Sequence, residues 1–274
     1  MKIRHLFPAL IILLFSCKGS SDNTEKKASA DTIKNQVPAV EAKLKRDPRT
    51  IGAAKSDAQR KIDEDIKKIN MASNPLCGYW VGDFGKNKIN ITLAYIKDSI
   101  AEGHSVCAGN YREIKGSVKK ISDTKYEFIM TEPGDDQYDG RFKFTIDLNE
   151  KNLKGNWAPF KNTVGVKTYI LEKREFKYDP NVGDFAYASN TAMDESEVGN
   201  LMPDEAELMR NEIYARHGYS FQNLKMRRIF DAKDWYIPMG IDIRDQLTEV
   251  EAKNIDLLYN YEKYHEEYYD SYGR

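Results

Sequence analysis

Residues 208–219 read LMRNEIYARHGY, which is the pattern of the last turns of a helix and its end. Gly218 stands where a helix commonly ends in a left-handed residue, a conformation that glycine adopts at least cost. Arg216 and His217 fill the last turn, where positive charge meets the negative end of the helix dipole. Glu212 precedes Arg216 by one helical turn, which is the favourable order for an ion pair along a helix. The stretch therefore predicts a helix that ends at Gly218.

This predicted helix is too polar for an ordinary core helix. Met209, Ile213 and His217 share one face, and Arg210 and Tyr214 share the next. A helix that buries Arg, Asn, Tyr and His side chains needs a hydrogen-bond partner for each of them. We therefore expect a small polar network beneath the helix.

The pentapeptide Tyr214-Ala215-Arg216-His217-Gly218 is the motif for which the YARHG domain is named, and this part of the chain resembles that family. Further matching positions lie on both sides of the motif, namely Arg210, Asn211, Glu212, Phe221, Phe230, Trp235, Tyr236, Pro238, Leu247, Thr248, Glu249 and Asn254. The resemblance covers roughly residues 200–261. It implies a small all-helical module of bacterial envelope proteins, over residues 200–274, and it implies no particular activity.

The N-terminal residues have the pattern of a bacterial targeting signal. Positive residues precede an apolar run, residues 6–15, which is too short to span a bilayer as a helix because that needs about 20 residues. The run ends in Leu14-Phe15-Ser16-Cys17, which resembles a lipobox. The resemblance implies a signal peptide over residues 1–16 and lipidation of Cys17. The alternative is an ordinary secretory signal that is cleaved nearby.

The residues after Cys17 predict the location and a tether. Lys18 replaces the Asp that usually retains lipoproteins in the inner membrane, so we expect an outer-membrane lipoprotein, on its periplasmic or its surface face. Residues 17–56 are poor in bulky apolar residues, which predicts a flexible tether. Residues 57–73 predict a helix with one apolar face, formed by Ile62, Ile66 and Ile69, which acts as a spacer or as a brace on the next domain.

Residues 74–178 alternate apolar and polar side chains with a period of two, which is typical of half-buried strands. The clearest runs are Ile89, Ile91, Leu93 and Tyr95, and Phe142, Phe144, Ile146 and Leu148. Turn signals separate the runs, so we expect about eight short antiparallel strands in a small barrel or strongly curved sheet. Gly78-Tyr79-Trp80 resembles the start of lipocalin-type barrels, over these three residues alone.

The chain has three cysteines, and lipid would occupy Cys17. Cys77 and Cys107 remain, both in the strand-rich part and both outside the cytoplasm. We therefore expect a disulfide between them. Two free buried thiols are the alternative.

The C-terminal third completes an α+β fold. Residues 179–199 show little apolar periodicity and predict a linker. Pro203 and the acids after it open the first helix of the module. Thr248 and Glu251 predict a capping box for the last helix.

The sequence offers no recognisable catalytic or metal site. It lacks a Gly-x-Ser-x-Gly elbow, and its four histidines form no zinc-peptidase pair. His217 with Glu212 is the only plausible acid–base pair, but the two lie on different helix faces. The acidic loop 132–140 could offer oxygen ligands to Ca²⁺ but lacks EF-hand spacing. We assign no catalytic residue, metal or cofactor, and leave Ca²⁺ binding by this loop open.

Aromatic residues near the motif are the candidates for ligand contacts. Tyr219, Trp235 and Tyr236 lie close in sequence to Arg210 and Arg216. Aromatic faces with guanidinium groups suit sugar rings, peptides or carboxylates. The alternative is that these side chains fill a small core.

Two functions remain open on this basis. The first is a non-enzymatic lipoprotein of the envelope that binds a cell-wall component such as peptidoglycan, another saccharide or a protein. The second is an envelope hydrolase, acting on peptidoglycan or peptide, with an unrecognised site. The net charge of −1 provides no basic footprint for nucleic acid.

Overall fold

The computed structural model describes residues 47–51, 54–71, 73–161 and 164–268, and all of them belong to one compact unit, residues 44–274. The predicted signal peptide, the lipidation site at Cys17 and most of the predicted tether lie outside the described residues. Within the described ranges, no helix is both long and apolar enough to cross a membrane.

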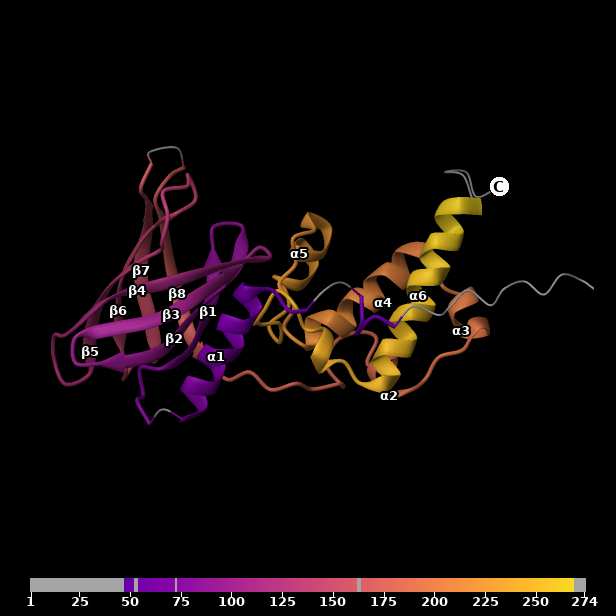
Figure 1. The fold of residues 1–274 in the computed structure, drawn as a ribbon, viewed down its shortest axis with the longest axis horizontal. Coiled ribbons are helices and arrows are strands. Elements are labelled where there is room, and N and C mark those ends of the chain that lie inside the picture. Colours follow the sequence, from indigo (N-terminus) through magenta and orange to yellow (C-terminus); the bar gives the residue numbers. More distant parts are fainter. Residues whose placement is uncertain (1–46, 52–53, 72, 162–163, 269–274) are drawn as a thin grey trace, which may run out of the picture. The chain divides into compact units, whose positions relative to one another are not determined.

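Eight antiparallel strands form a closed barrel, in which each strand pairs with the next and β8 pairs with β1 (Figure 1). The strands are β1 (Gly78–Phe84), β2 (Asn87–Lys97), β3 (Ile100–Cys107), β4 (Asn110–Lys120), β5 (Lys125–Thr131), β6 (Gly140–Asp147), β7 (Asn152–Pro159) and β8 (Lys167–Arg174). The predicted α+β fold with a small eight-stranded barrel is therefore confirmed.

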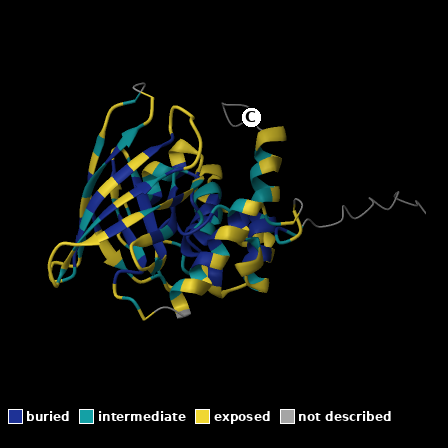
Figure 2. Cartoon of the chain, turned by 60° about the vertical axis from the view of Figure 1, so that its left-hand side comes forward, coloured by how far each residue is buried: buried dark blue, intermediate teal, exposed yellow. Residues whose placement is uncertain are grey.

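The barrel interior is filled by the apolar members of each alternating series (Figure 2). Ile91 of β2 and Phe142 of β6 are each at most 1% exposed. One series changes sides along its strand, because a β-bulge interrupts the pairing of β2 between Leu93 and Tyr95. Beyond the bulge, Ile96 packs against the core, and Tyr95 is 42% exposed.

The predicted disulfide is wrong, because Cys77 and Cys107 are both free thiols. Gly78, which follows Cys77, pairs with Leu93 of β2, whereas Cys107 pairs with Ile89 on the other edge of that strand. Strand spacing and rise per residue then separate the two Cα atoms by roughly 15–20 Å. A disulfide needs Cα atoms about 4.4–6.8 Å apart.

Helix α1 (Asp57–Met71) contacts the barrel and the loop around residues 237–242 in the C-terminal part. Ile62 is fully buried, and the Asp65 carboxylate lies 2.8 Å from Nδ1 of the buried His104 on β3. Gln59 Oε1 accepts hydrogen bonds from the backbone N–H groups of residues 241 and 242.

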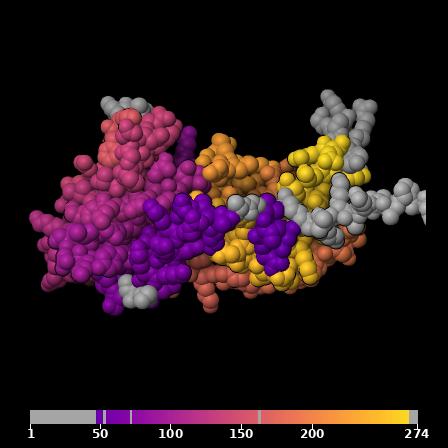
Figure 3. All heavy atoms as spheres, viewed as in Figure 1, coloured from indigo at the N-terminus to yellow at the C-terminus, as the bar shows by residue number. Residues whose placement is uncertain are grey.

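The described end of the predicted tether lies against the start of the last helix and the short turn before it, a difference from the expected flexible segment. Arg49 forms an ion pair with Glu249, and Lys55 lies 2.6 Å from Asp245. Figure 3 shows residues 47–51, in indigo, on the surface of the yellow helix.

The C-terminal part consists of short helices around one long pair. They are α2 (Tyr187–Asn190), α3 (Glu195–Gly199), α4 (Pro203–Arg216), α5 (Leu224–Phe230), the 3₁₀ turn η1 (Arg244–Gln246) and α6 (Glu249–Tyr268). The predicted linker 179–199 thus contains two helices, and Ala188 and Val198 belong to the same buried cluster as Met209 and Ile255.

The outer face of β2 joins the barrel to the helical part. Lys88 Nζ donates to the carbonyl oxygens of Lys233 (2.7 Å) and Tyr236 (3.1 Å). Asn90 Nδ2 donates to the carbonyl oxygen of Pro238 at 3.1 Å. Both side chains are buried, so the polar series of this strand faces protein instead of water.

Candidate functional site

Glu251, at the start of α6, is the centre of the polar network beneath the motif helix. Its Oε2 lies 2.8 Å from Nε2 of His217 and accepts the backbone N–H of Thr248 at 3.0 Å. Its Oε1 accepts the hydroxyls of Tyr178 (2.9 Å) and Ser189 (2.7 Å). The Glu251 N–H donates to Thr248 Oγ1, which confirms the predicted capping box.

Arg216 is held on the other side of the same network. Its guanidinium pairs with Glu212 and donates to Val182 O (2.8 Å) and Ser189 Oγ (3.0 Å). Glu212 also accepts the backbone N–H groups of residues 184 and 185, at 3.0 and 2.8 Å. The predicted Glu212–Arg216 pair is confirmed, and both side chains are at most 1% exposed.

The electrostatics of the network follow from its burial. Burial acts to raise the pKa of Glu251, but hydrogen bonds from His217 and the Thr248 N–H outweigh it, so this pKa is lowered. Burial, reinforced by the charge of Glu251, raises the pKa of Tyr178 to about 12. The Tyr178 ring stacks on His217 with centroids 4.4 Å apart. The lowered pKa keeps Glu251 ionised, and its two oxygens are hydrogen-bonded to the groups around it.

The motif residues outside the network also have structural contacts. Arg210 pairs with both oxygens of Glu262 (2.7 and 2.8 Å), and Asn211 Nδ2 donates to the Glu207 carbonyl. Ala215 is buried against the aromatic cluster. Gly218 has a φ of 74°, which confirms the predicted left-handed helix end.

The three aromatic candidates differ in exposure. Tyr236 is 1% exposed, packs against Phe230 and donates its hydroxyl to Tyr219 O at 2.7 Å. A role for Tyr236 in ligand contact is therefore wrong, because its ring fills the core. Trp235 is half-buried at the edge of the same cluster. Tyr219 lines a cavity of about 590 Å³ together with Arg210.

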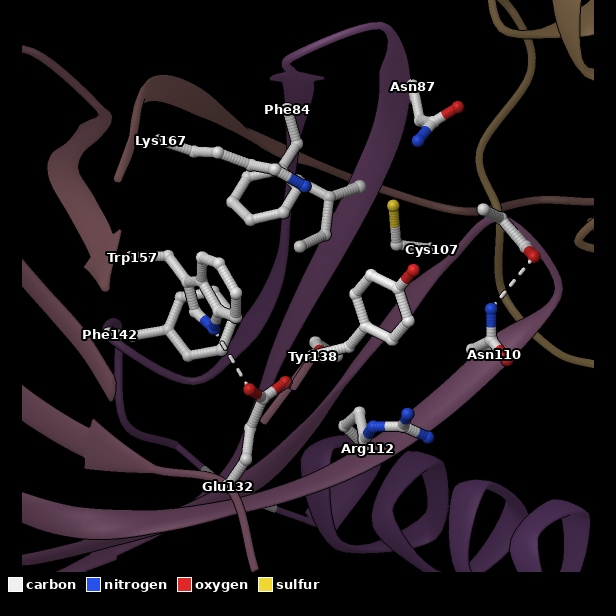
Figure 4. A pocket seen from close by; sticks show the side chains of 13 residues that line it. Phe84, Asn87, Cys107, Asn110, Arg112, Glu132, Tyr138, Phe142, Trp157 and Lys167 are labelled. Atoms are coloured by element: carbon white, nitrogen blue, oxygen red, sulfur yellow. Dashed lines mark hydrogen bonds between the residues drawn. The ribbon is translucent and has the colours of Figure 1, made fainter. Parts of the chain in front are cut away.

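A second cavity, of about 360 Å³, lies at one end of the barrel (Figure 4). It lies beside the β1–β2, β3–β4 and β5–β6 turns, the end of β7 and the start of β8. Its lining combines aromatic and apolar side chains with polar and charged ones, namely Phe84, Asn87, Ile89, Ser105, Cys107, Ala108, Asn110, Arg112, Glu132, Tyr138, Phe142, Trp157 and Lys167.

Strand register explains why charged side chains reach this cavity. Arg112 is two residues before the buried Ile114 of β4, and Glu132 is two residues after the buried Met130 of β5. Lys167 is likewise two residues before the buried Tyr169 of β8. Because side chains two apart in a strand share a face, all three point to the inside of the barrel. The same spacing of two residues can be read from the sequence, but our prediction from the sequence did not place Arg112, Glu132 or Lys167 inside the barrel.

Glu132 is fixed in the wall of the cavity. Its Oε2 accepts Nε1–H of the buried Trp157 (2.9 Å) and the backbone N–H of Gly140 (2.8 Å). Burial raises its pKa in spite of these hydrogen bonds. Figure 4 shows its other oxygen turned toward Tyr138.

The two cations of the cavity have different partners. Arg112 Nε lies 3.2 Å from Asp139, which is itself buried. Lys167 Nζ lies over the Phe84 ring, 4.3 Å from its centroid, and 5.4 Å from that of Trp157. Within the part of the chain that the structure describes, no carboxylate lies within ion-pair distance of Lys167.

The acidic loop 132–140 is organised by internal hydrogen bonds. Asp139 accepts the backbone N–H of Asp136 at 2.9 Å and faces Arg112. Over the described ranges, no three His, Cys, Asp or Glu side chains converge in a metal-binding group.

Together these features define a closed barrel joined to a helical module with a buried polar network. Residues 184–263 match the YARHG domain family, so the chain contains a YARHG domain at its C-terminal end. The domain begins before the predicted boundary at residue 200, because the backbone at residues 184 and 185 binds Glu212. Comparisons with curated proteins and with solved structures gave no match.

Proposed function

We propose that this protein is a non-catalytic binding protein of the bacterial cell envelope, anchored in the outer membrane through Cys17. In this proposal the YARHG domain is a structural support, and the barrel supplies the binding site. The partner is a component of the cell wall or another envelope molecule.

The cavity at the end of the barrel is the observation that carries this proposal. Its volume of about 360 Å³ lies in the range of small-molecule sites, about 300–1,000 Å³. It combines aromatic walls with a few charged groups, which is the usual composition of ligand pockets. By contrast, the motif residues Glu212, Arg216 and His217 are buried and bonded to one another or to nearby groups.

Envelope location is supported by the apolar N-terminal run that ends at Cys17. Replacement Cys17→Ala should abolish lipidation, so the protein should leave the membrane fraction and lose the mass of the lipid. Membrane fractionation and mass spectrometry of the whole protein measure both effects. A Cys17→Ala protein that fractionates as the wild type does would contradict the anchor.

Binding is tested by incubating the mature protein with purified peptidoglycan and with the soluble fragments that peptidoglycan yields. We expect retention or saturable binding without any change in the partner. Release of new reducing ends or of amino groups would instead support an envelope hydrolase. Absence of binding to peptidoglycan, its fragments and envelope extracts would contradict the proposal.

A further inference from the structure

We propose that the cavity at the end of the barrel binds a small amphipathic acid. In this assignment the carboxylate of the ligand meets Lys167, and its apolar body packs among Phe84, Phe142 and Trp157. The inference rests on the proposed function, because it names the ligand class of the same binding site.

We infer a negatively charged ligand from the partners of the charged side chains in the cavity. Asp139 matches Arg112, and Glu132 is held by Trp157 Nε1 and the Gly140 N–H. Lys167 is different, because its ammonium group lies over the rings of Phe84 and Trp157, and no described carboxylate lies within ion-pair distance of it. A carboxylate oxygen would add an ionic partner to these ring contacts, in a setting where partial burial strengthens the attraction.

The arrangement of the lining separates the two ends of such a ligand. Figure 4 shows Lys167 and Glu132 on opposite sides of the Trp157 ring. A ligand anion at Lys167 is therefore kept away from the Glu132 carboxylate. Phe84, Phe142 and Trp157 are each at most 6% exposed, and they present apolar surface between the two charged groups.

The same lining disfavours a neutral saccharide. Sugar hydroxyls need several convergent donors and acceptors, and the amide of Asn110 already donates to the Ala108 carbonyl at 3.0 Å. Arg112 is paired with Asp139. Among the described residues, the cavity therefore offers one cation without an ion-pair partner, together with aromatic walls, and this lining suits an acid with an apolar body better than a polyol.

The test compares two probes that differ only in their polar end, octanoate and octan-1-ol. The protein is the mature chain from residue 17 onward with Cys17→Ser, studied without detergent by titration calorimetry. We expect octanoate to bind about tenfold or more tightly than octan-1-ol, because a hydrogen bond between two charged groups is stronger than one between Lys167 and a neutral hydroxyl. Equal affinities, or no binding of octanoate, would overturn the inference.

A pair of variants locates the effect. Lys167→Met keeps the length and apolar stem of the side chain, so it should bind both probes with similar affinity. Lys119→Met removes an exposed lysine of β4 outside the cavity and should retain the preference for octanoate. Thermal melts check that both variants are folded. A preference that survives in Lys167→Met would place the anion elsewhere and refute this site.

The outcomes also separate this inference from the proposed function. Binding to peptidoglycan or its fragments without any preference for octanoate would leave the proposed function standing and reject the acid. Saturable octanoate binding that Lys167→Met weakens, without retention on any envelope fraction, would support the site and reject a cell-wall partner.

Discussion

Replacement of Glu251 tests whether the polar network stabilises the fold. Glu251→Ala would remove the acceptor of four hydrogen bonds, from His217, Tyr178, Ser189 and the Thr248 N–H. Removing one partner from a buried ion-pair network costs about 3–5 kcal/mol. That is a large fraction of a total stability of about 5–15 kcal/mol. We therefore expect a large drop in the free energy of unfolding.

Glu251→Gln isolates the contribution of the charge. The amide keeps the shape of the side chain, and the hydroxyls of Tyr178 and Ser189 can rotate to accept from its NH₂ group. The loss should therefore be smaller, about 1–2 kcal/mol, which is the difference between charged and neutral hydrogen bonds. Glu249→Ala, at the first residue of the same helix, is the control. The Glu249 side chain is 71% exposed, so the control should lose less than about 1 kcal/mol of its free energy of unfolding.

The pH dependence of the Glu251→Gln effect provides an independent check. The pKa of Glu251 is lower in the folded chain than its ordinary value of 4.5. Its ionised form therefore contributes stability fully above that value, and the contribution is lost as pH falls through the folded pKa. The difference between wild type and Glu251→Gln should accordingly shrink as pH falls below 4.5.

Urea unfolding followed by tryptophan fluorescence and circular dichroism measures these changes. A Glu251→Ala protein within about 1 kcal/mol of wild type, or no more affected than Glu249→Ala, would refute the structural role of the network.

Three further predictions concern other parts of the chain. Glu132→Gln should raise the midpoint of urea unfolding at pH 7 and have little effect at pH 4. Burial raises the pKa of Glu132, so its ionised form destabilises the folded state at pH 7. An unchanged or lower midpoint at pH 7 would contradict this effect of burial. Denatured, unreduced protein should show two titratable thiols, Cys77 and Cys107. Native Cys107 should alkylate slowly, because burial raises its pKa to about 12. If neither thiol can be titrated, the two cysteines form the disulfide after all. Gly218→Ala should destabilise the folded protein by more than about 1–2 kcal/mol, because a left-handed φ is costly for alanine and the new Cβ would lie 2.7 Å from Met239. A melting temperature equal to that of the wild type would contradict this strain.

The features that the sequence predicted are those with local causes. The helix end at Gly218, the Glu212–Arg216 pair and the capping box of Thr248 and Glu251 each depend on residues within one or two turns. The barrel followed from the period-two alternation of its strands, which needs no knowledge of the partner strand. Local patterns of this kind determine element type and much of the fold class.

The features that were missed depend on partners distant in sequence. The sequence placed Glu251 in the capping box of the last helix. Its second role, as the centre of the polar network, depends on His217 at the end of α4 and on Tyr178 in the segment after the barrel. The polar series at Lys88 and Asn90 gave no sign of burial, because a pattern of period two does not show what covers the polar face. The disulfide failed for a related reason, since compartment and cysteine count say nothing about strand register.

The contacts between the two parts of the structure suggest why a barrel with an open cavity carries a YARHG domain. Asp231, at the end of α5, accepts the backbone N–H of Lys88 at 2.9 Å, one residue after the cavity residue Asn87. Ser220, two residues after the motif, accepts the backbone N–H of Gly109 at 2.9 Å in the β3–β4 turn. Both bonds therefore fix turns at the end of the barrel where the cavity lies. Since turns without such contacts are usually the most mobile parts of a barrel, the domain holds two sides of the cavity in place. Loss of the polar network should thus weaken ligand binding through these turns, although none of its residues lines the cavity.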